Sequence, residues 1–362
     1  MLEWLTRAAV GRRADQGVSP VRFLDACARR PVDATPVWLM RQAGGYLPEY
    51  RAIREKLSFI EMCKRPDVAC EVTLQPLRRF ELDAAIVFTD ILSPLEPMGI
   101  GFHFAPQGGP VIEKPIRGGR DVRDVRAIDP RTELDHVMET LRLVRREIDG
   151  TTPLIGLAGA PYTLASYVVE GGCSRDHARV KALMLGDQPT FGRLMELLAE
   201  VVAGCLLAQI EAGAQAVQLF DSWVGQLAPF DYERFVLPHV RYIVDQVRGH
   251  GAPVIYFADG ASGMLELVCQ AGADVYGIDW RIGLDRAREQ LGDVAVQGKL
   301  DPLTLLGTQA AIEERVADVL RRAGGRPGHV FNLGHDLVPR IDPENVRFLV
   351  DTVHRLSAGA RG

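Results

Sequence analysis

Short apolar runs recur along the chain, and polar or ionisable side chains follow each of them. Most runs are rich in Val, Ile, Leu or Phe and are too short for a helix, so the pattern predicts buried β-strands. The eight predicted strands are residues 36–40, 84–88, 154–158, 216–220, 253–257, 274–278, 294–296 and 329–331. In a parallel α/β barrel, the loops at the carboxyl ends of such strands meet at one mouth and build the active site.

The segments between these runs predict amphipathic helices. Leu134, Leu141 and Ile148, for example, belong to an apolar set at helical spacing. Glycines 213, 272 and 324 follow three such segments and predict helix ends, since glycine readily adopts the left-handed turn found there. We therefore predict an α/β fold, a single (β/α)8 TIM barrel over residues 20–362, with its active site at the C-terminal ends of the strands. A doubly wound open sheet is the alternative, although no Gly-x-Gly-x-x-Gly follows an early strand.

Two smaller features do not fit the alternation of strand and helix. Residues 102–104 and 111–112 predict a β-hairpin with Gly108 and Gly109 at its tip. Residues 1–19 lack a continuous apolar core and a small-residue cleavage site, so we expect a flexible leader there rather than a signal peptide.

Composition narrows the class of protein. The chain has 362 residues, of which 47% are hydrophobic and 25% charged, as in ordinary globular domains. No apolar run approaches the ~20 residues that span a bilayer, so we expect no membrane association. The net charge of −5 argues against non-specific nucleic-acid binding. Six scattered cysteines form neither a disulfide framework nor a metal motif, which favours the cytoplasm.

Basic residues gather just after the first predicted strand. Arg41 follows that strand directly, and Arg51 and Arg54 lie within the next predicted helix. Arginine's planar fork suits paired hydrogen bonds to carboxylates or phosphates. We therefore predict an anion-binding role for Arg41, whereas Arg51 and Arg54 are also explained by the solvated face of a helix.

Asp90 lies two residues beyond the second predicted strand, among apolar neighbours. A helix cap is the ordinary role of Asp in such a loop. A carboxylate among Ile86, Phe88 and Ile91 nevertheless needs donors or a cation to stay ionised. Because the position falls at the barrel mouth, we favour a functional carboxylate that a ligand with several N–H groups would satisfy.

Three further polar residues follow predicted strands, and each has an ordinary explanation. Tyr167 also fits an amphipathic helix core, Ser222 a helix N-cap and His335 a loop histidine bonded to backbone. No His-Glu-x-x-His, no Gly-x-Ser-x-Gly and no zinc-spaced Cys/His cluster occurs in the sequence. The sequence therefore predicts a site without metal or organic cofactor.

Several motifs, in this order, resemble those of one family. They are PVWLMRQAGGYLPEYR at 36–51, QPLRRF at 75–80 followed by DAAIVFTDIL at 83–92, GAPYTL at 159–164, FDSW at 220–223, QGKLDP at 297–302 and NLGH at 332–335. From about residue 21 to about residue 356, the chain resembles the uroporphyrinogen decarboxylase family of haem biosynthesis. The resemblance implies a cofactor-free (β/α)8 barrel, usually a homodimer, which converts the four acetate side chains of uroporphyrinogen III to methyls.

The resemblance also implies roles for individual residues. Asp90 would accept hydrogen bonds from the pyrrole N–H groups and stabilise a cationic intermediate. Arg41 would bind a substrate carboxylate, which suits it better than proton donation, because a guanidinium rarely loses its proton. Arg51 and Arg54 resemble further carboxylate-facing positions. Tyr167, Ser222 and His335 match positions that contact substrate carboxylates or order the pocket, and Phe220 is expected to pack against the macrocycle.

Three positions depart from the family pattern. Gly45 stands where a second arginine is usual, Asp336 replaces a glycine, and Lys299 replaces an asparagine. Losing a cation should weaken the binding of a polyanion, and we hypothesise that Lys299 partly compensates. Two rival functions follow: a corrinoid or thiol methyltransferase of the same superfamily, and a tetrapyrrole binder without catalytic activity. The fifth-strand loop carries no His or Cys for the methyltransferase zinc site.

Overall fold

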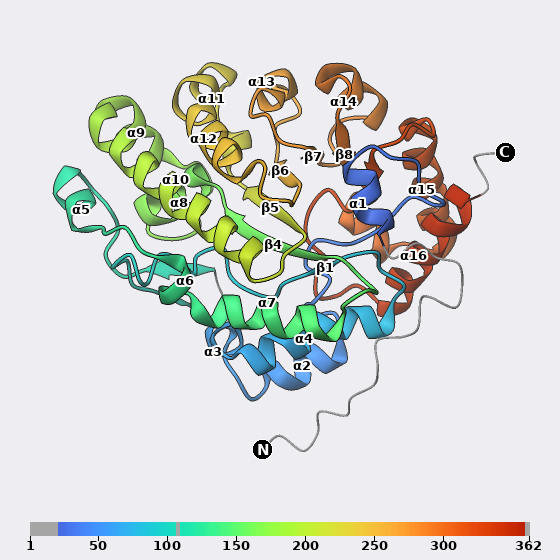
Figure 1. The fold of residues 1–362 in the computed structure, drawn as a ribbon. Coiled ribbons are helices and arrows are strands. Elements are labelled where there is room, and N and C mark those ends of the chain that lie inside the picture. Colours follow the sequence, from blue (N-terminus) through green and yellow to red (C-terminus); the bar gives the residue numbers. More distant parts are fainter. Residues whose placement is uncertain (1–20, 106–108, 359–362) are drawn as a thin grey trace.

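The computed structural model describes residues 21–105 and 109–358, and its central element is a curled sheet of seven parallel strands (Figure 1). Its strands are β1 (Ala85–Ile86), β4 (Leu154–Gly159), β5 (Ala216–Asp221), β6 (Val254–Ala258), β7 (Val275–Gly277), β8 (Ala295–Gln297) and β9 (His329–Val330). They lie side by side in chain order, each parallel to the next. Seven of the eight predicted strands are therefore confirmed.

The prediction of a strand at residues 36–40 is wrong. The segment makes one parallel bridge to the sheet, between Val37 and Phe331, where the Phe331 N–H donates to the Pro36 carbonyl at 2.8 Å. Pro36 has no N–H to offer, and the Val37 N–H donates at 2.8 Å to the Asp83 carboxylate. A side chain thus takes the backbone donor that would extend the pairing.

Helices flank the sheet and cover its convex side (Figure 1). In the first half of the chain these are α1 (Arg22–Cys27), α2 (Pro48–Arg54), α3 (Phe59–Lys64), α4 (Pro66–Arg79), α5 (Gly119–Asp124), α6 (Pro130–Glu133), α7 (Asp135–Glu147), α8 (Pro161–Glu170) and α9 (Ala178–Gly186). The second half has α10 (Gln188–Glu211), α11 (Pro229–Phe235), α12 (Leu237–Val247), α13 (Leu265–Cys269), α14 (Leu284–Leu291), α15 (Gln309–Ala323) and α16 (Pro343–Ala358), with 3-10 turns η2 (Val224–Gln226) and η3 (Pro302–Leu306). Within the described ranges, no helix has the length and apolar character to cross a membrane.

The predicted helix signals are confirmed. The apolar set from Leu134 onward forms α7, and Gly213, Gly272 and Gly324 all have positive φ after α10, α13 and α15. The predicted hairpin is also present, as antiparallel β2 (Phe102–Phe104) and β3 (Pro110–Ile112). Gly108 at its tip and the predicted leader at 1–19 lie outside the described residues.

A chain of polar side chains crosses the concave side of the sheet. Trp38 Nε1 donates to Gln297 Oε1, and Gln297 Nε2 donates to Gln218 Oε1, both at 2.9 Å. Gln218 lies in β5 and Gln297 in β8, so their side chains meet inside the curve of the sheet. Since side chains alternate along a strand, Phe220 faces inward with Gln218, whereas Asp221 faces the helices.

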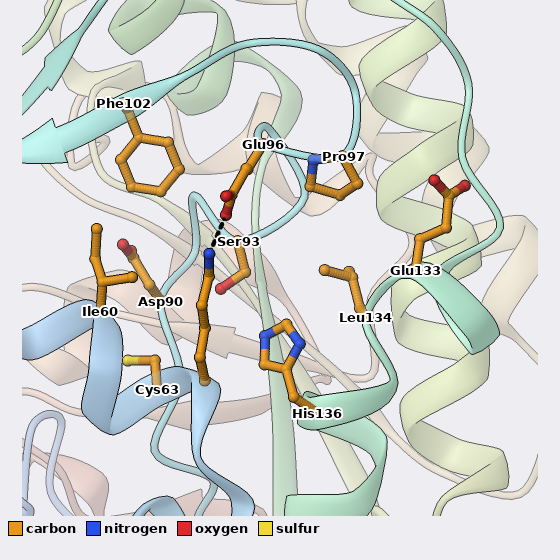
Figure 2. A pocket seen from close by; sticks show the side chains of 11 residues that line it. Ile60, Cys63, Asp90, Ser93, Glu96, Pro97, Phe102, Glu133, Leu134 and His136 are labelled. Carbon is orange, nitrogen blue, oxygen red and sulfur yellow. Dashed lines mark ion pairs between the residues drawn. The ribbon is translucent and has the colours of Figure 1, made fainter.

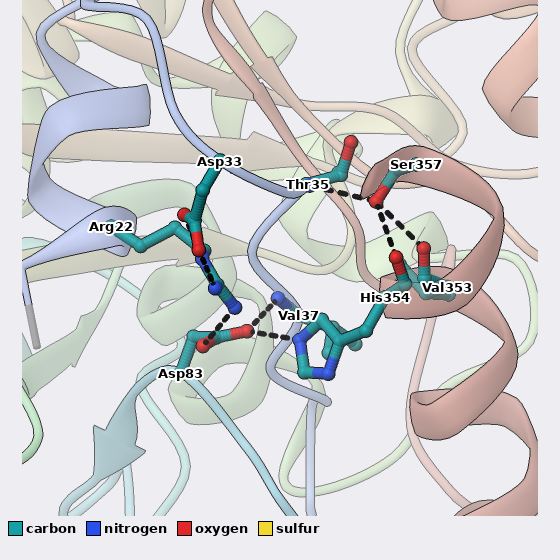
Figure 3. A network of polar contacts seen from close by, with 8 residues as sticks. All are labelled: Arg22, Asp33, Thr35, Val37, Asp83, Val353, His354 and Ser357. Atoms are coloured by element: carbon teal, nitrogen blue, oxygen red, sulfur yellow. Dashed lines mark hydrogen bonds and ion pairs between the residues drawn. The ribbon is translucent and has the colours of Figure 1, made fainter. Parts of the chain in front are cut away.

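Asp83, directly before β1, joins three distant segments (Figure 3). Its Oδ1 accepts a hydrogen bond from Arg22 of α1 at 3.3 Å, and its Oδ2 accepts one from the Val37 N–H. The same Oδ2 lies 2.7 Å from Nε2 of His354 in α16. Asp83 is 3% exposed and Arg22 is 4% exposed, so both charges depend on their partners, and Arg22 also pairs with Asp33, its Nε lying 2.6 Å from Oδ1. The carboxylate thus connects the two ends of the fold.

Replacing Asp83 should therefore destabilise the protein. We expect Asp83→Asn to lower the free energy of unfolding by about 3 kcal/mol, because the amide weakens the buried hydrogen bonds to Arg22, Val37 and His354 together, although Arg22 keeps its ion pair with Asp33. Urea unfolding followed by circular dichroism measures this. Asp25→Asn is the matched control, because it opens an exposed ion pair with Arg30 beside the same helix and should change stability by less than about 1 kcal/mol. Equal losses in the two variants would contradict the role given to Asp83.

Candidate active site

Asp90 lies in the loop after β1 and combines the two roles that its sequence position suggested. Its Oδ1 accepts a hydrogen bond from the Leu92 N–H at 3.1 Å, as a local cap would. Its Oδ2 is buried and has no hydrogen-bond partner among the described residues. A buried carboxylate oxygen without a donor is unfavourable, so this atom is available to a ligand that carries N–H groups.

Burial also shifts the pH at which Asp90 ionises. It raises the pKa of the Asp90 carboxyl from 3.8 to about 6, while the Leu92 N–H and the positive charge of Arg41 act in the opposite direction. Asp90 is therefore an ionised carboxylate above about pH 6. Arg41 is close enough to contribute to this balance, so the structure brings together these two predicted site residues.

Arg41 presents its guanidinium at the surface of the same region. Its side chain is 72% exposed, and Nε lies 2.7 Å from Oδ2 of Asp336. Nδ1 of His335 lies 3.7 Å from the same oxygen. The Arg41 backbone is in the left-handed region, with φ of 57°, which is uncommon for a residue other than glycine and is often found at functional loops. Arg41 and His335 thus converge on one carboxylate, although 294 residues separate them in sequence.

Tyr167 lies on α8 with its ring edge-on to Trp223, at a centroid distance of 5.8 Å. Burial raises the pKa of the Tyr167 phenol well above its ordinary value, and the negative charge of Asp90 adds to that rise. The phenol is therefore a neutral hydrogen-bond donor near Asp90. Ser222, half-buried between Asp221 and Trp223, follows the end of β5.

Aromatic rings connect Phe220 to the His335 loop. The rings of Phe220 and Phe257 meet edge-on at 6.1 Å, and those of Phe257 and His335 meet edge-on at 6.5 Å. Trp280 contacts the other side of His335 at 6.5 Å. These side chains give the inner face near the strand ends an apolar surface that suits a flat ring system.

Arg51 and Arg54 bind the backbone. Nη1 of Arg51 donates to the carbonyls of Gly45 and Tyr46, at 2.9 and 3.0 Å, and Nη1 of Arg54 donates to the Leu57 carbonyl at 2.5 Å. They therefore stabilise the loop that carries Gly45 and the end of α2. Their role toward substrate carboxylates stays a prediction.

A cavity of about 350 Å³ opens beside Asp90 (Figure 2). Its polar wall includes Cys63, Lys64, Ser93, Glu96 and His136. Lys64 Nζ lies 2.6 Å from Glu96 Oε2 across the opening. Of the predicted site residues, Asp90 alone lines this cavity. It is thus a space to one side of the region where Arg41 and His335 meet.

Several polar residues beneath the site were not given roles by sequence reasoning. Asp221 is fully buried and bonded to Thr163 and Tyr256, and Asp279 binds Arg281 and the Gly260 N–H. Their positions, at the end of β5 and just after β7, were a usable signal, but their partners were not visible in the pattern. Within residues 21–105 and 109–358, no three His, Cys, Asp or Glu side chains gather as a metal site.

A parallel α/β fold whose strand-end loops combine a half-buried carboxylate, an exposed arginine and an aromatic surface is typical of one class, α/β enzymes that bind a ligand at the C-terminal ends of their strands. Comparison with known proteins makes this specific. Residues 19–356 match the family described as uroporphyrinogen decarboxylase (URO-D). The chain belongs to the uroporphyrinogen decarboxylase family.

Individual relatives agree with this assignment. A protein named uroporphyrinogen decarboxylase from Carboxydothermus hydrogenoformans is 53% identical over 93% of this chain and 96% of its own length. One of the same name from Roseiflexus sp. is 54% identical over 93% of this chain and 99% of its own. Among solved structures, a methyltransferase from Methanosarcina mazei superposes with a TM-score of 0.79 over 94% of this chain and 99% of its own, at 16% identity. That likeness shows the fold alone.

The raised pKa of Asp90 predicts a stability effect with a definite sign. The folded-state pKa of about 6 exceeds the ordinary 3.8, so the contribution of protonated Asp90 is complete below about pH 4 and is lost as the pH rises through 6. Asparagine does not ionise. We therefore expect Asp90→Asn to gain about 2–3 kcal/mol in unfolding free energy, relative to the unchanged protein, between pH 4 and pH 8. Urea unfolding of both proteins at the two pH values checks this, and a difference that stays constant would contradict it.

Proposed function

We propose that this chain is a uroporphyrinogen decarboxylase, which converts the four acetate side chains of uroporphyrinogen III to methyls and releases CO₂ and coproporphyrinogen III. The observation that carries the proposal is the buried, unpartnered Oδ2 of Asp90 close to the Arg41 guanidinium. One group accepts from pyrrole N–H donors and the other takes a carboxylate, which are the two kinds of polar group on this substrate. Relatives with this name at 53% and 54% identity support it.

The chemistry needs no separate electron sink. Protonation of the pyrrole ring gives a cation, which accepts the electron pair of the C–C bond to the acetate carboxylate as CO₂ leaves. A proton then adds to the exocyclic carbon to complete the methyl group, and the ring loses the proton it had gained. The protein must hold the carboxylate in place and stabilise the cation, which is electrostatic preorganisation.

Asp90 is suited to the stabilising role. Above pH 6 its carboxylate is negative and lies in apolar surroundings, where its attraction to a developing cation is stronger than in water. The unpartnered Oδ2 accepts the pyrrole N–H groups and so places the ring over the charge. The neutral Tyr167 phenol adds a donor without cancelling that charge.

The polar residues around Asp90 bind the carboxylates of the substrate. Arg41 exchanges Asp336 for a substrate carboxylate, and Ser222 and His335 supply further polar contacts. Arg51 and Arg54 supply further guanidinium groups for the same purpose, while Phe220 packs against the macrocycle beside Phe257. Arg41 is thus assigned to carboxylate binding, which suits a guanidinium better than proton donation, the alternative role.

The departures from the family pattern bear on affinity. A Cβ at Gly45 would contact only Pro339, at 3.4 and 3.6 Å, so no backbone clash requires glycine there. Asp336 competes with substrate for Arg41. Lys299 Nζ donates to the Trp280 carbonyl at 3.3 Å, and burial with the nearby Arg322 lowers the pKa of its ammonium. Compensation of Gly45 by Lys299 stays a hypothesis, and an unchanged KM in Lys299→Ala would end it.

Four finer features belong to the same proposal. Segment 36–40 serves as the eighth element of a (β/α)8 barrel, supported by its bridge to Phe331 and by the Asp83 N–H, which donates to the Val37 carbonyl at 2.8 Å. The working form is a homodimer without metal or organic cofactor, as the family resemblance implies, and the cysteine pattern favours the cytoplasm. The absence of disulfides among the six cysteines supports a reducing compartment.

The decisive experiment is anaerobic incubation of the purified protein with uroporphyrinogen III, followed by mass analysis of the oxidised products. We expect stepwise loss of four carboxyl groups without added cofactor. Asp90→Asn should lower kcat by at least a hundredfold and change KM by less than about threefold, because the amide cannot stabilise the cation.

The other outcomes point elsewhere. Unchanged octacarboxylate from folded protein that still binds the tetrapyrrole would identify a binder without activity. Stoichiometric zinc in the purified protein would favour the methyltransferase. Near-normal turnover of Asp90→Asn would show that the assignment of Asp90 is wrong even if the decarboxylase activity is present.

A further inference from the structure

Asp221 is a buried carboxylate that the proposed chemistry does not use. It is the last residue of β5, it is fully inaccessible, and it lies between Phe220 and Ser222. Gln218 and Phe220 face the concave side of the sheet, so Asp221 faces the helices on the other side. It therefore touches no substrate, although both of its sequence neighbours are site residues.

The Asp221 carboxylate is bonded at both oxygens to hydroxyl groups from neighbouring βα units. Thr163, in the first turn of α8, donates to Oδ1 at 2.8 Å. Tyr256, in β6, donates to Oδ2 at 3.0 Å, and the hydroxyl of Tyr232 in α11 donates to that of Tyr256 at 3.4 Å. One side chain thus links α8, β5, β6 and α11.

These links fix elements that carry site residues. Thr163 and Tyr167 are four residues apart on α8 and so share one face of that helix. Tyr167 contacts Trp223, which is two residues beyond Asp221. The backbone adds to the link, since the Ala160 N–H donates to the Phe220 carbonyl at 2.7 Å. A shift at Asp221 would therefore move the Tyr167 phenol relative to Ser222 and Phe220.

We propose that Asp221 is a positioning residue, which holds α8 against the end of β5 so that Tyr167, Ser222 and Phe220 keep their relative places. This rests on the proposed function only for its effect on catalysis; the geometry is independent of it. A carboxylate suits the task because it accepts two hydroxyl hydrogen bonds, whereas an amide has one acceptor and would turn its NH₂ toward a donor.

Substitutions that remove the partner hydroxyl groups but keep the side-chain shape test this without opening a cavity. Thr163→Val and Tyr256→Phe each remove one donor to Asp221, and Thr163→Ser keeps it. Tyr276→Phe is the matched control: Tyr276 is a buried neighbour of Tyr256 in the sheet, and its hydroxyl donates to the Cys269 carbonyl at 2.7 Å, away from the site. We expect kcat to fall about tenfold in Thr163→Val and Tyr256→Phe with KM within about twofold, and to stay within twofold in Thr163→Ser and Tyr276→Phe.

A crystal structure of Thr163→Val gives a result that does not depend on activity. The Tyr167–Trp223 ring pair should depart from its 5.8 Å edge-on arrangement. An unchanged ring pair, or kcat losses no larger than that of Tyr276→Phe, would overturn the proposal. Failure of the proposed function would instead show as an inactive unchanged protein, and the ring geometry would then decide the role of Asp221.

Discussion

The site depends on a carboxylate that the fold buries without satisfying. Asp90 receives one hydrogen bond, from the Leu92 N–H, and its second oxygen has no partner among the described residues. Apolar surroundings raise the pKa of the carboxyl to about 6, and the Arg41 charge limits the rise. Such a group is unfavourable without a partner and becomes favourable once N–H donors or a cation approach it. The protein keeps a less stable arrangement where that arrangement serves its chemistry.

Two other carboxylates place the parts of the site around Asp90. Asp83, at the start of β1, holds α1, segment 36–40 and α16 together, and that segment leads directly to Arg41. Asp221, at the end of β5, holds α8 and β6 through hydroxyl groups. Both are buried and bonded at both oxygens, whereas Asp90 is half-buried and its buried Oδ2 has no partner among the described residues. Asp83 and Asp221, whose oxygens are all hydrogen-bonded, stabilise the fold, whereas Asp90 has an oxygen that can accept a hydrogen bond from a ligand.

Sequence patterns predicted the strands well because apolar runs of strand length report burial on both faces of a parallel sheet. The exception at residues 36–40 arose from a side chain: the Val37 N–H binds Asp83, which lies 46 residues away, and no local pattern shows that contact. The positions of Arg41, Asp90 and His335 after their runs were also visible, since strand ends share one edge. Their roles came from the resemblance to a family.

Contacts at the level of single hydrogen bonds could not be predicted. Nothing in the spacing of Arg51 and Arg54 indicated that they bind backbone carbonyls, because a guanidinium on a helix serves solvent, substrate or backbone equally well. The side of the sheet on which Asp221 lies was easier to predict. Once Gln218 is placed inside the curve, strict alternation puts Asp221 among the helices, but its two hydroxyl partners come from two other elements, α8 and β6.

The central claim is that Asp90 ionises near pH 6 in the folded protein, and its direct titration tests this best. The carboxyl carbon can be followed by ¹³C NMR from pH 4 to pH 8 in protein labelled at aspartate, and the signal is assigned by its absence from Asp90→Asn. We expect a midpoint near 6. A midpoint near 4 would mean that Asp90 is hydrated like a surface carboxylate, and that a buried, unsatisfied charge is not the basis of the site.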